Sequence, residues 1–243
     1  MNTELLLKIG RERFKNDALL EPFTKDEAAD AFVSDLEHFP HRFVLACLMD
    51  RQIKYEKAWE IPYRVSSLTG KETIAELSSI SKDEYVRLFV ENSLHRFNEK
   101  MADIFYCGVQ DIKNKYDGNA AKIWANTPSS AALVGRFLEF KGAGPKIATM
   151  AANLLVRHFK VPLSDYYSID ISVDTHVRRV MTRLGCVPKG AKIETVIHKA
   201  REISPEFPGL IDFACFEIGR ECCHPTKPDC EHCAMRSGCD KVI

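Results

Sequence analysis

Apolar residues recur at intervals of three and four along almost the whole chain, which is the spacing of amphipathic helices. No stretch alternates Val, Ile and Thr with polar residues in the manner of a half-buried strand. The fold class is therefore predicted to be all-α. The expected helical segments are 1–14, 28–36, 41–51, 54–66, 86–90, 97–112, 133–138, 147–155, 177–184 and 210–218.

Three of these segments are preceded by helix-capping residues. Thr24-Lys25-Asp26-Glu27 and Ser81-Lys82-Asp83-Glu84 both have the capping-box pattern, in which a hydroxyl and a glutamate three residues later exchange hydrogen bonds. Asp174 directly precedes the stripe that begins at Val177, so it is expected to cap that helix.

Composition describes an ordinary globular chain of 243 residues, with 45% hydrophobic and 28% charged residues. No apolar run reaches the length of a membrane span, and the first residues lack the pattern of a signal peptide. We therefore expect a cytoplasmic protein that is neither secreted nor membrane-bound. In that compartment the nine cysteines favour metal binding over disulfides.

The net charge is zero, but the charges are unevenly distributed. Between residues 141 and 201 there are 11 Lys and Arg against 4 Asp and Glu. This excess is equally consistent with a local site for a polyanion and with solvated helix faces.

A short turn, Lys141-Gly142-Ala143-Gly144-Pro145-Lys146, separates two apolar stripes and predicts a helix hairpin. Glycines in such a turn permit positive φ and let a phosphate approach the backbone at the start of the second helix. Pro145 suits the first turn of that helix, where no N–H is required. A Gly-x-Gly pair is also typical of an ordinary tight turn between two helices, and on that pattern alone the ordinary turn is favoured.

Residues 222–239 contain five cysteines, and the last four are spaced Cys223-x6-Cys230-x2-Cys233-x5-Cys239. Four thiolates on short loops suit a zinc ion or a [4Fe–4S] cluster, and generic chemistry does not decide between them. The four other cysteines are expected to be small buried hydrophobes; they are Cys47, Cys107, Cys186 and Cys215.

The 6-2-5 spacing resembles the iron–sulfur loop of the endonuclease III and adenine-mismatch glycosylase branch of the helix-hairpin-helix DNA glycosylase superfamily. The order of motifs is similar too: the hairpin, then Val173-Asp174-Thr175-His176, then the cysteine loop. This resemblance implies a six-helix barrel domain at 36–160, with the hairpin near 130–158. It implies a second helical domain, made of 1–35 and 161–243, that carries a [4Fe–4S] cluster in the loop 223–239, with a DNA-binding cleft between the two domains.

The resemblance also implies roles for individual residues. Lys146 occupies the place of the lysine that attacks the sugar in bifunctional members, and Asp174 that of the catalytic aspartate. A carboxylate there stabilises positive charge at C1′ or helps to deprotonate the amine. Cys223, Cys230, Cys233 and Cys239 become the cluster ligands, which leaves Cys222 as the spare. The residues expected to contact DNA are Lys141, Gly142, Gly144, His176, Arg178 and Gln52, where Gln52 would fill the gap left by a flipped base.

The expected activity is removal of a damaged or modified base from duplex DNA, followed by β-elimination at the abasic site, by a monomeric enzyme. The hairpin departs from the usual pattern at Lys141 and Ala143, and 53–93 matches neither branch, so the sequence does not identify the base. Two alternatives remain: a monofunctional glycosylase, in which Lys146 only contacts phosphate, and a non-catalytic iron–sulfur protein that senses DNA.

Overall fold

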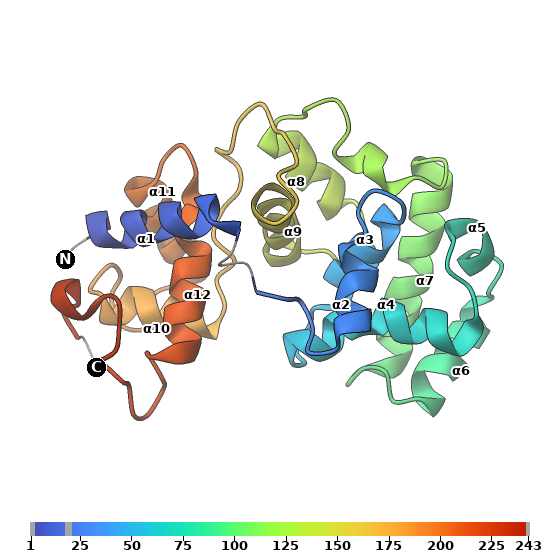
Figure 1. Ribbon diagram of the computed structural model, residues 1–243, viewed down its shortest axis with the longest axis horizontal. Coiled ribbons are helices and arrows are strands. Elements are labelled where there is room, and N and C mark those ends of the chain that lie inside the picture. Colours follow the sequence, from blue (N-terminus) through green and yellow to red (C-terminus); the bar gives the residue numbers. More distant parts are fainter. Residues whose placement is uncertain (1–2, 18–20, 242–243) are drawn as a thin grey trace. The chain divides into compact units, whose positions relative to one another are not determined.

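The computed structural model describes residues 3–17 and 21–241, and within these ranges the regular elements are all helices (Figure 1). The all-α fold class predicted from the sequence is confirmed. The first helix covers the expected 1–14 segment apart from Met1 and Asn2, which lie outside the described residues. The α-helices are α1 (Thr3–Lys15), α2 (Glu27–Ser34), α3 (Pro40–Met49), α4 (Tyr55–Thr69), α5 (Ile74–Leu77), α6 (Lys82–Glu91), α7 (Asn98–Lys115), α8 (Ser130–Leu138), α9 (Pro145–Arg157), α10 (Thr175–Arg183), α11 (Ile193–Ile203) and α12 (Asp212–Glu221). The short 3₁₀ helices are η2 (Ala120–Ile123), η3 (Pro208–Ile211) and η4 (Arg236–Gly238).

The chain divides into two compact units. The first, which we call the terminal unit, contains 3–17, 129–134 and 152–241; the second, the central unit, contains 21–128 and 135–151. Helices α8 and α9 contribute residues to both units. These divisions fall at other positions than the expected domain boundaries at residues 36 and 160, and the assignment of 36–160 as a six-helix barrel stays a prediction.

The core of the terminal unit lies among α1, α10, α11 and α12. Leu6, Val177 and Met181 are almost fully buried there, together with Ala214 of α12. Helices α10 and α12 run side by side (Figure 1) and approach closely at one glycine. A Cβ added to Gly219 would lie 2.6 Å from Cβ of His176, so the close packing of these helices requires glycine at that position.

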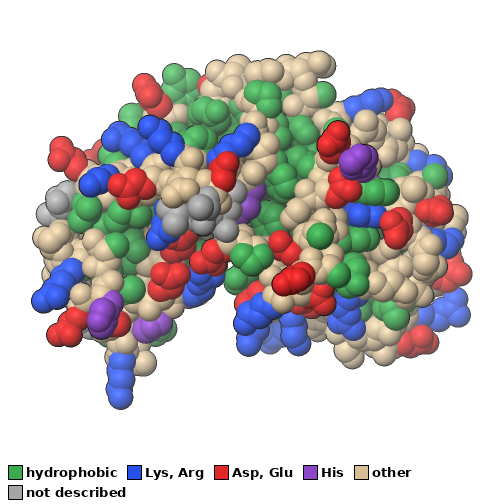
Figure 2. Space-filling model, viewed as in Figure 1, with side chains coloured by type: hydrophobic (Ala, Val, Ile, Leu, Met, Phe, Trp, Pro, Cys, Tyr) green, Lys and Arg blue, Asp and Glu red, His purple; other side chains and the backbone are tan. Residues whose placement is uncertain are grey.

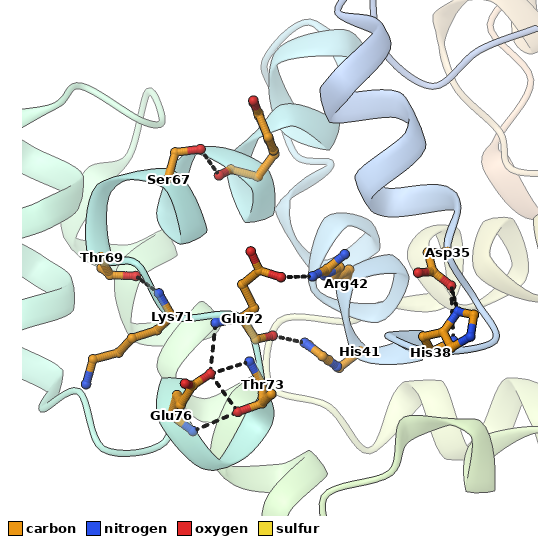
Figure 3. A network of polar contacts seen from close by, with 11 residues as sticks. Asp35, His38, His41, Arg42, Ser67, Thr69, Lys71, Glu72, Thr73 and Glu76 are labelled. Carbon is orange, nitrogen blue, oxygen red and sulfur yellow. Dashed lines mark hydrogen bonds and ion pairs between the residues drawn. The ribbon is translucent and has the colours of Figure 1, made fainter.

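The central unit is built around α3, all of whose residues from Pro40 to Met49 are buried. A helix that is buried all round needs partners for its few polar side chains. Nε2 of His41 lies 2.8 Å from the carbonyl oxygen of Glu72, and Nη2 of Arg42 lies 2.6 Å from its carboxylate (Figure 3). The guanidinium of Arg42 also packs between Phe32 and Phe39, 3.6 Å from each ring centroid.

The capping predictions succeed at two positions and fail at one. Ser81 and Glu84 form the predicted capping box at the start of α6, and Asp174 caps α10. The prediction for Thr24 is wrong, because Asp26 is the N-cap of α2 and accepts bonds from the N–H groups of Ala28 and Ala29. An aspartate closer to the helix satisfies these donors directly.

On the face drawn in Figure 2, acidic and basic side chains are interspersed over the surface. None of the helices in the described part of the chain combines the length and the apolar character needed to cross a bilayer.

Candidate functional site

The predicted hairpin is present: α8 ends at Leu138 and α9 begins at Pro145. Gly142 has φ +87°, and a Cβ there would meet Cδ1 of Ile104 at 2.7 Å, so this position requires glycine for both its conformation and its packing. Gly144 differs, because its φ is not positive and a Cβ would meet nothing within 4 Å. The missing side chain of Gly144 therefore leaves open space at the start of α9.

This open space adjoins the N-terminus of α9. The first N–H groups of a helix have no carbonyl partner within it, and the helix dipole places partial positive charge there. Lys146 stands in this first turn with its side chain 47% exposed. The start of α9 therefore combines accessible backbone, a positive dipole end and one amine, which suits an anion.

A carboxylate lies beside this amine. Oδ2 of Asp50, the C-cap residue of α3, is 3.9 Å from Nζ of Lys146, and the Asp50 side chain is only 12% exposed. No sequence pattern pairs these two residues, since 96 positions separate them. The one local signal was an acidic residue at a helix C-terminus, where the dipole disfavours negative charge.

The next residue joins the same turn to the hairpin. Nη2 of Arg51 donates a 2.8 Å hydrogen bond to the carbonyl oxygen of Gly142. Gln52 follows with φ +54° and an exposed side chain. The structure thus brings Gln52, Gly142, Gly144 and Lys146 of the predicted set into one region of the central unit.

Lys141 is placed differently from Lys146. Its Nζ is 2.7 Å from Oδ2 of Asp103, whose other oxygen lies 2.8 Å from Nζ of Lys82. The two lysines lower the pKa of the Asp103 carboxyl. Lys141 is thus ion-paired across to α7, and its contact with DNA stays a prediction.

Asp174 belongs to the terminal unit. Its Oδ1 accepts a 2.7 Å hydrogen bond from the N–H of Val177, which fixes the carboxylate at the first turn of α10. His176 packs its ring against Phe216 of α12, with centroids 5.5 Å apart, and Arg178 is partly exposed. Because Lys146 and Asp174 belong to different units, the catalytic pairing expected from the sequence stays a prediction.

Two arginines of α10 hold the cysteine loop. Nε of Arg179 donates a 2.5 Å hydrogen bond to the carbonyl of Cys223. Nη1 of Arg183 donates to the carbonyl of His224 at 2.6 Å and lies 3.3 Å from the sulfur of Cys223. Sequence analysis did not single out either arginine for this role. Both side chains sit on the face of α10 that the loop covers.

The five clustered cysteines line one pocket. Three of them, Cys223, Cys233 and Cys239, also pack against the core of the terminal unit. Within 3–17 and 21–241, no three His, Cys, Asp or Glu side chains are close enough to hold one metal ion. Ligands of one tetrahedral zinc, each about 2.3 Å from it, must lie within about 4 Å of one another. The residues that line this pocket are Arg183, Cys222, Cys223, Pro228, Asp229, Cys230, Cys233, Arg236, Cys239 and Lys241.

The other four cysteines were predicted to be buried hydrophobes. Cys47, Cys186 and Cys215 are buried, as predicted, and burial raises the pKa of each thiol. Cys107 is the exception: it is only partly buried, and its thiol lies 3.8 Å from the carboxylate of Asp103.

Comparison with known proteins places this geometry in context. No family model matches the chain. Endonuclease III of Thermotoga maritima is 25% identical over 202 residues, which cover 83% of each chain. Among solved structures, an endonuclease III trapped as a covalent intermediate with DNA superposes with a TM-score of 0.60 at 19% identity, covering 88% of this chain and 92% of that one.

A second solved structure extends the comparison. The 8-oxoguanine glycosylase/lyase of Clostridium acetobutylicum, bound to DNA with cytosine opposite 8-oxoguanine, also has a TM-score of 0.60, at 17% identity. The match covers 91% of this chain and 70% of that one. The chain therefore shares the fold of these two structures, and its sequence is similar to that of an endonuclease III over most of its length, in agreement with the resemblance seen in the motifs.

Proposed function

We propose that this chain is a base-excision glycosylase with abasic-site lyase activity, acting on a damaged or modified base in duplex DNA. The observation that carries the proposal is the position of Lys146. It stands in the first turn of α9, directly after the Gly142–Gly144 turn, with a half-exposed amine. The endonuclease III relative, which matches 83% of the chain, supports this assignment.

In this proposal Nζ of Lys146 is the nucleophile. It attacks C1′ of the target sugar, the bond between C1′ and the base breaks, and its electron pair leaves with the base. Rearrangement gives a Schiff base, from which β-elimination nicks the strand. The carboxylate of Asp174 stabilises the positive charge that develops at C1′. The target nucleotide first leaves the base stack, as enzymes acting on a base in a duplex require.

The DNA backbone is proposed to bind at the start of α9. The open space at Gly144 admits a phosphate to the helix N-terminus. Gln52, whose side chain is exposed beyond the end of α3, is proposed to fill the gap in the stack. Lys141, His176 and Arg178 are proposed to contact the backbone, and the protein is proposed to act as a monomer.

The four cysteines at 223, 230, 233 and 239 are proposed to hold a [4Fe–4S] cluster. The donor set fits, because all four thiols line one pocket. The cluster would cross-link the loop to the end of α12 and supply no bond-making step.

A monofunctional glycosylase is the second candidate, and the place of Lys146 in the first turn of α9, where a basic residue suits a phosphate, favours it. In that case water would attack C1′, and Lys146 would only bind phosphate.

Strand nicking separates the two candidates. Duplexes with an oxidised pyrimidine, 8-oxoguanine or an abasic site are incubated with the protein, and half of each sample is then heated in alkali. Nicking without alkali supports the lyase. Nicking that requires alkali indicates the monofunctional enzyme, and no base release from any modified duplex contradicts both.

A further inference from the structure

The carboxylate beside Lys146 is placed where a helix alone would not favour it. Asp50 is the C-cap residue of α3, and negative charge at a helix C-terminus is unfavourable because it meets the negative end of the helix dipole. Its side chain is 12% exposed, so its charge is also partly removed from water. A carboxylate that is unfavourable for its own helix and largely shielded needs a compensating partner. Lys146 is a cation that lies beside it, with Nζ 3.9 Å from Oδ2 of Asp50.

The geometry of this pair is fixed by neighbours on both sides. Arg51 ties the turn after α3 to the hairpin through the carbonyl of Gly142, at 2.8 Å. The buried ring of His95 lies 3.3 Å from the carbonyl of Met49, which ends α3. These contacts hold Asp50 at a set distance from the first turn of α9. The pair is thus built into the central unit and is more constrained than an ion pair between two exposed side chains.

A second hairpin lysine provides a contrast. Lys141 pairs with Asp103 at 2.7 Å, within hydrogen-bond distance, and Asp103 also binds Lys82. Lys146 and Asp50 are separated by 3.9 Å, which is beyond a hydrogen bond and within Coulomb attraction. The amine of Lys146 is therefore oriented by Asp50 without a hydrogen bond to it, and a small movement brings the two groups within the distance of a proton transfer.

We propose that Asp50 is the positioning residue of Lys146 and the acceptor of its proton. This inference rests on the proposed function and assigns different roles to two carboxylates. Asp50 positions the nucleophile and accepts its proton, and Asp174 stabilises the positive charge at C1′. On an abasic site, the ammonium of Lys146 gives one proton to Asp50, and the neutral amine adds to the C1′ aldehyde. The carbinolamine then loses its hydroxyl, which leaves as water with the proton held by Asp50. The product is a protonated Schiff base.

The test is single-turnover borohydride trapping on an abasic duplex from pH 6 to pH 9, at saturating protein. Asp50→Asn is expected to trap at least tenfold more slowly than wild type at pH 7, and to recover as pH rises and hydroxide takes over as acceptor. Asp50→Glu, whose longer side chain keeps a carboxylate near the amine, is expected to restore part of the rate. Duplex affinity is expected to stay within threefold of wild type.

Stability distinguishes this role from a structural one. Because Asp50 is unfavourable at the end of α3, Asp50→Asn is expected to leave the thermal midpoint unchanged or to raise it. Asp50→Ser is a second neutral variant, should the amide disturb the turn. Asp103→Asn is the matched control: it releases another hairpin lysine and is expected to trap at the wild-type rate.

The outcomes of these experiments distinguish an error in the role of Asp50 from an error in the proposed lyase activity. If wild type forms no adduct, or Lys146→Ala still forms one, the lyase itself is wrong. If wild type traps through Lys146, and both neutral variants keep its rate and pH profile or exceed its rate, only the role of Asp50 is wrong. A lowered midpoint together with lost duplex binding in both neutral variants would make Asp50 a structural residue and overturn the inference.

Discussion

Nη2 of Arg51 donates a 2.8 Å hydrogen bond to the carbonyl oxygen of Gly142, which links the turn after α3 to the turn before α9. The two residues lie 91 positions apart. Their contact explains how three positions that the sequence marked separately, Gln52, Gly142 and Lys146, come to share one region. It also ties the turn that is proposed to bind phosphate to the core helix of the central unit.

The two hairpin glycines are expected to respond differently to the same substitution. Gly142→Ala places a Cβ at φ +87° against Ile104, and we expect it to lower the free energy of unfolding by about 1–3 kcal/mol. The Cβ of Gly144→Ala would have no atom within 4 Å, so this substitution is expected to change the free energy of unfolding by less than about 0.5 kcal/mol. It is expected to weaken duplex binding about tenfold, because the methyl group occupies the space proposed for a phosphate. Urea unfolding and fluorescence anisotropy measure the two effects; unchanged affinity in Gly144→Ala would contradict the proposed phosphate site.

Asp174 caps α10 and is also proposed to act in catalysis, and two substitutions separate these two roles. Asparagine caps a helix as well as aspartate does, so Asp174→Asn is expected to keep stability within about 0.5 kcal/mol of wild type. Loss of the negative charge is expected to reduce single-turnover base release about 100-fold or more. Asp174→Ala removes the cap as well and is expected to cost about 1 kcal/mol of stability. Asp26→Asn, at the N-cap of α2, is the control that should leave activity intact. Full activity in Asp174→Asn would remove this residue from the mechanism.

The cysteine assignment predicts which thiols hold iron. Serine at Cys223, Cys230, Cys233 or Cys239 is expected to reduce iron and acid-labile sulfide per chain, and to bleach the visible iron–sulfur absorbance. Cys222→Ser is expected to retain both, since Cys222 is the proposed spare. Cys107→Ser, in the other unit, is the control. Stoichiometric zinc without iron in protein purified without oxygen would show that the cluster assignment is wrong.

The buried histidine of α3 predicts a pH dependence of stability. Burial, with a smaller contribution from the charge of Arg42, lowers the pKa of His41 from 6.5 to about 4. Above pH 6.5 both the folded and the unfolded states are neutral at this residue. As pH falls from 6.5 towards 4, only the unfolded state takes up the proton, so stability declines, by about 2 kcal/mol at pH 5.

The comparison variant is His41→Gln, whose amide can still donate to the carbonyl of Glu72. The difference between the unfolding free energies of wild type and variant is expected to change by that amount between pH 7 and pH 5. Taking this difference removes the contribution of His95, whose pKa burial also lowers. A difference that stays constant over this range would show that His41 is protonated in the folded protein.

Most of the features that could be predicted from the sequence depend on local patterns. The helix stripes, the hairpin turn at 141–146 and the caps at Ser81 and Asp174 depend on neighbours within a few residues, and the structure confirms them. The capping box at Thr73 and Glu76 has the same pattern and was missed, because the helix that it starts is only four residues long and has no apolar stripe.

Long-range relationships could not be predicted in the same way. The pairing of Asp50 with Lys146 and the support that Arg179 and Arg183 give to the cysteine loop depend on how distant helices pack. The proposal that the cysteine loop holds a [4Fe–4S] cluster rests on a resemblance in cysteine spacing and motif order, both of which are properties of the sequence. The identity of the excised base depends on a pocket whose segment, 53–93, carries no recognised pattern.

The most direct test of the account is a covalent adduct between Lys146 and DNA. The folded, metal-loaded protein is mixed with an abasic duplex and borohydride, and the adduct is digested and mapped by mass spectrometry. The account predicts a single adduct, on the peptide that contains Lys146, which disappears in Lys146→Ala. The absence of an adduct on a duplex that the protein binds, or an adduct on another lysine, would contradict it.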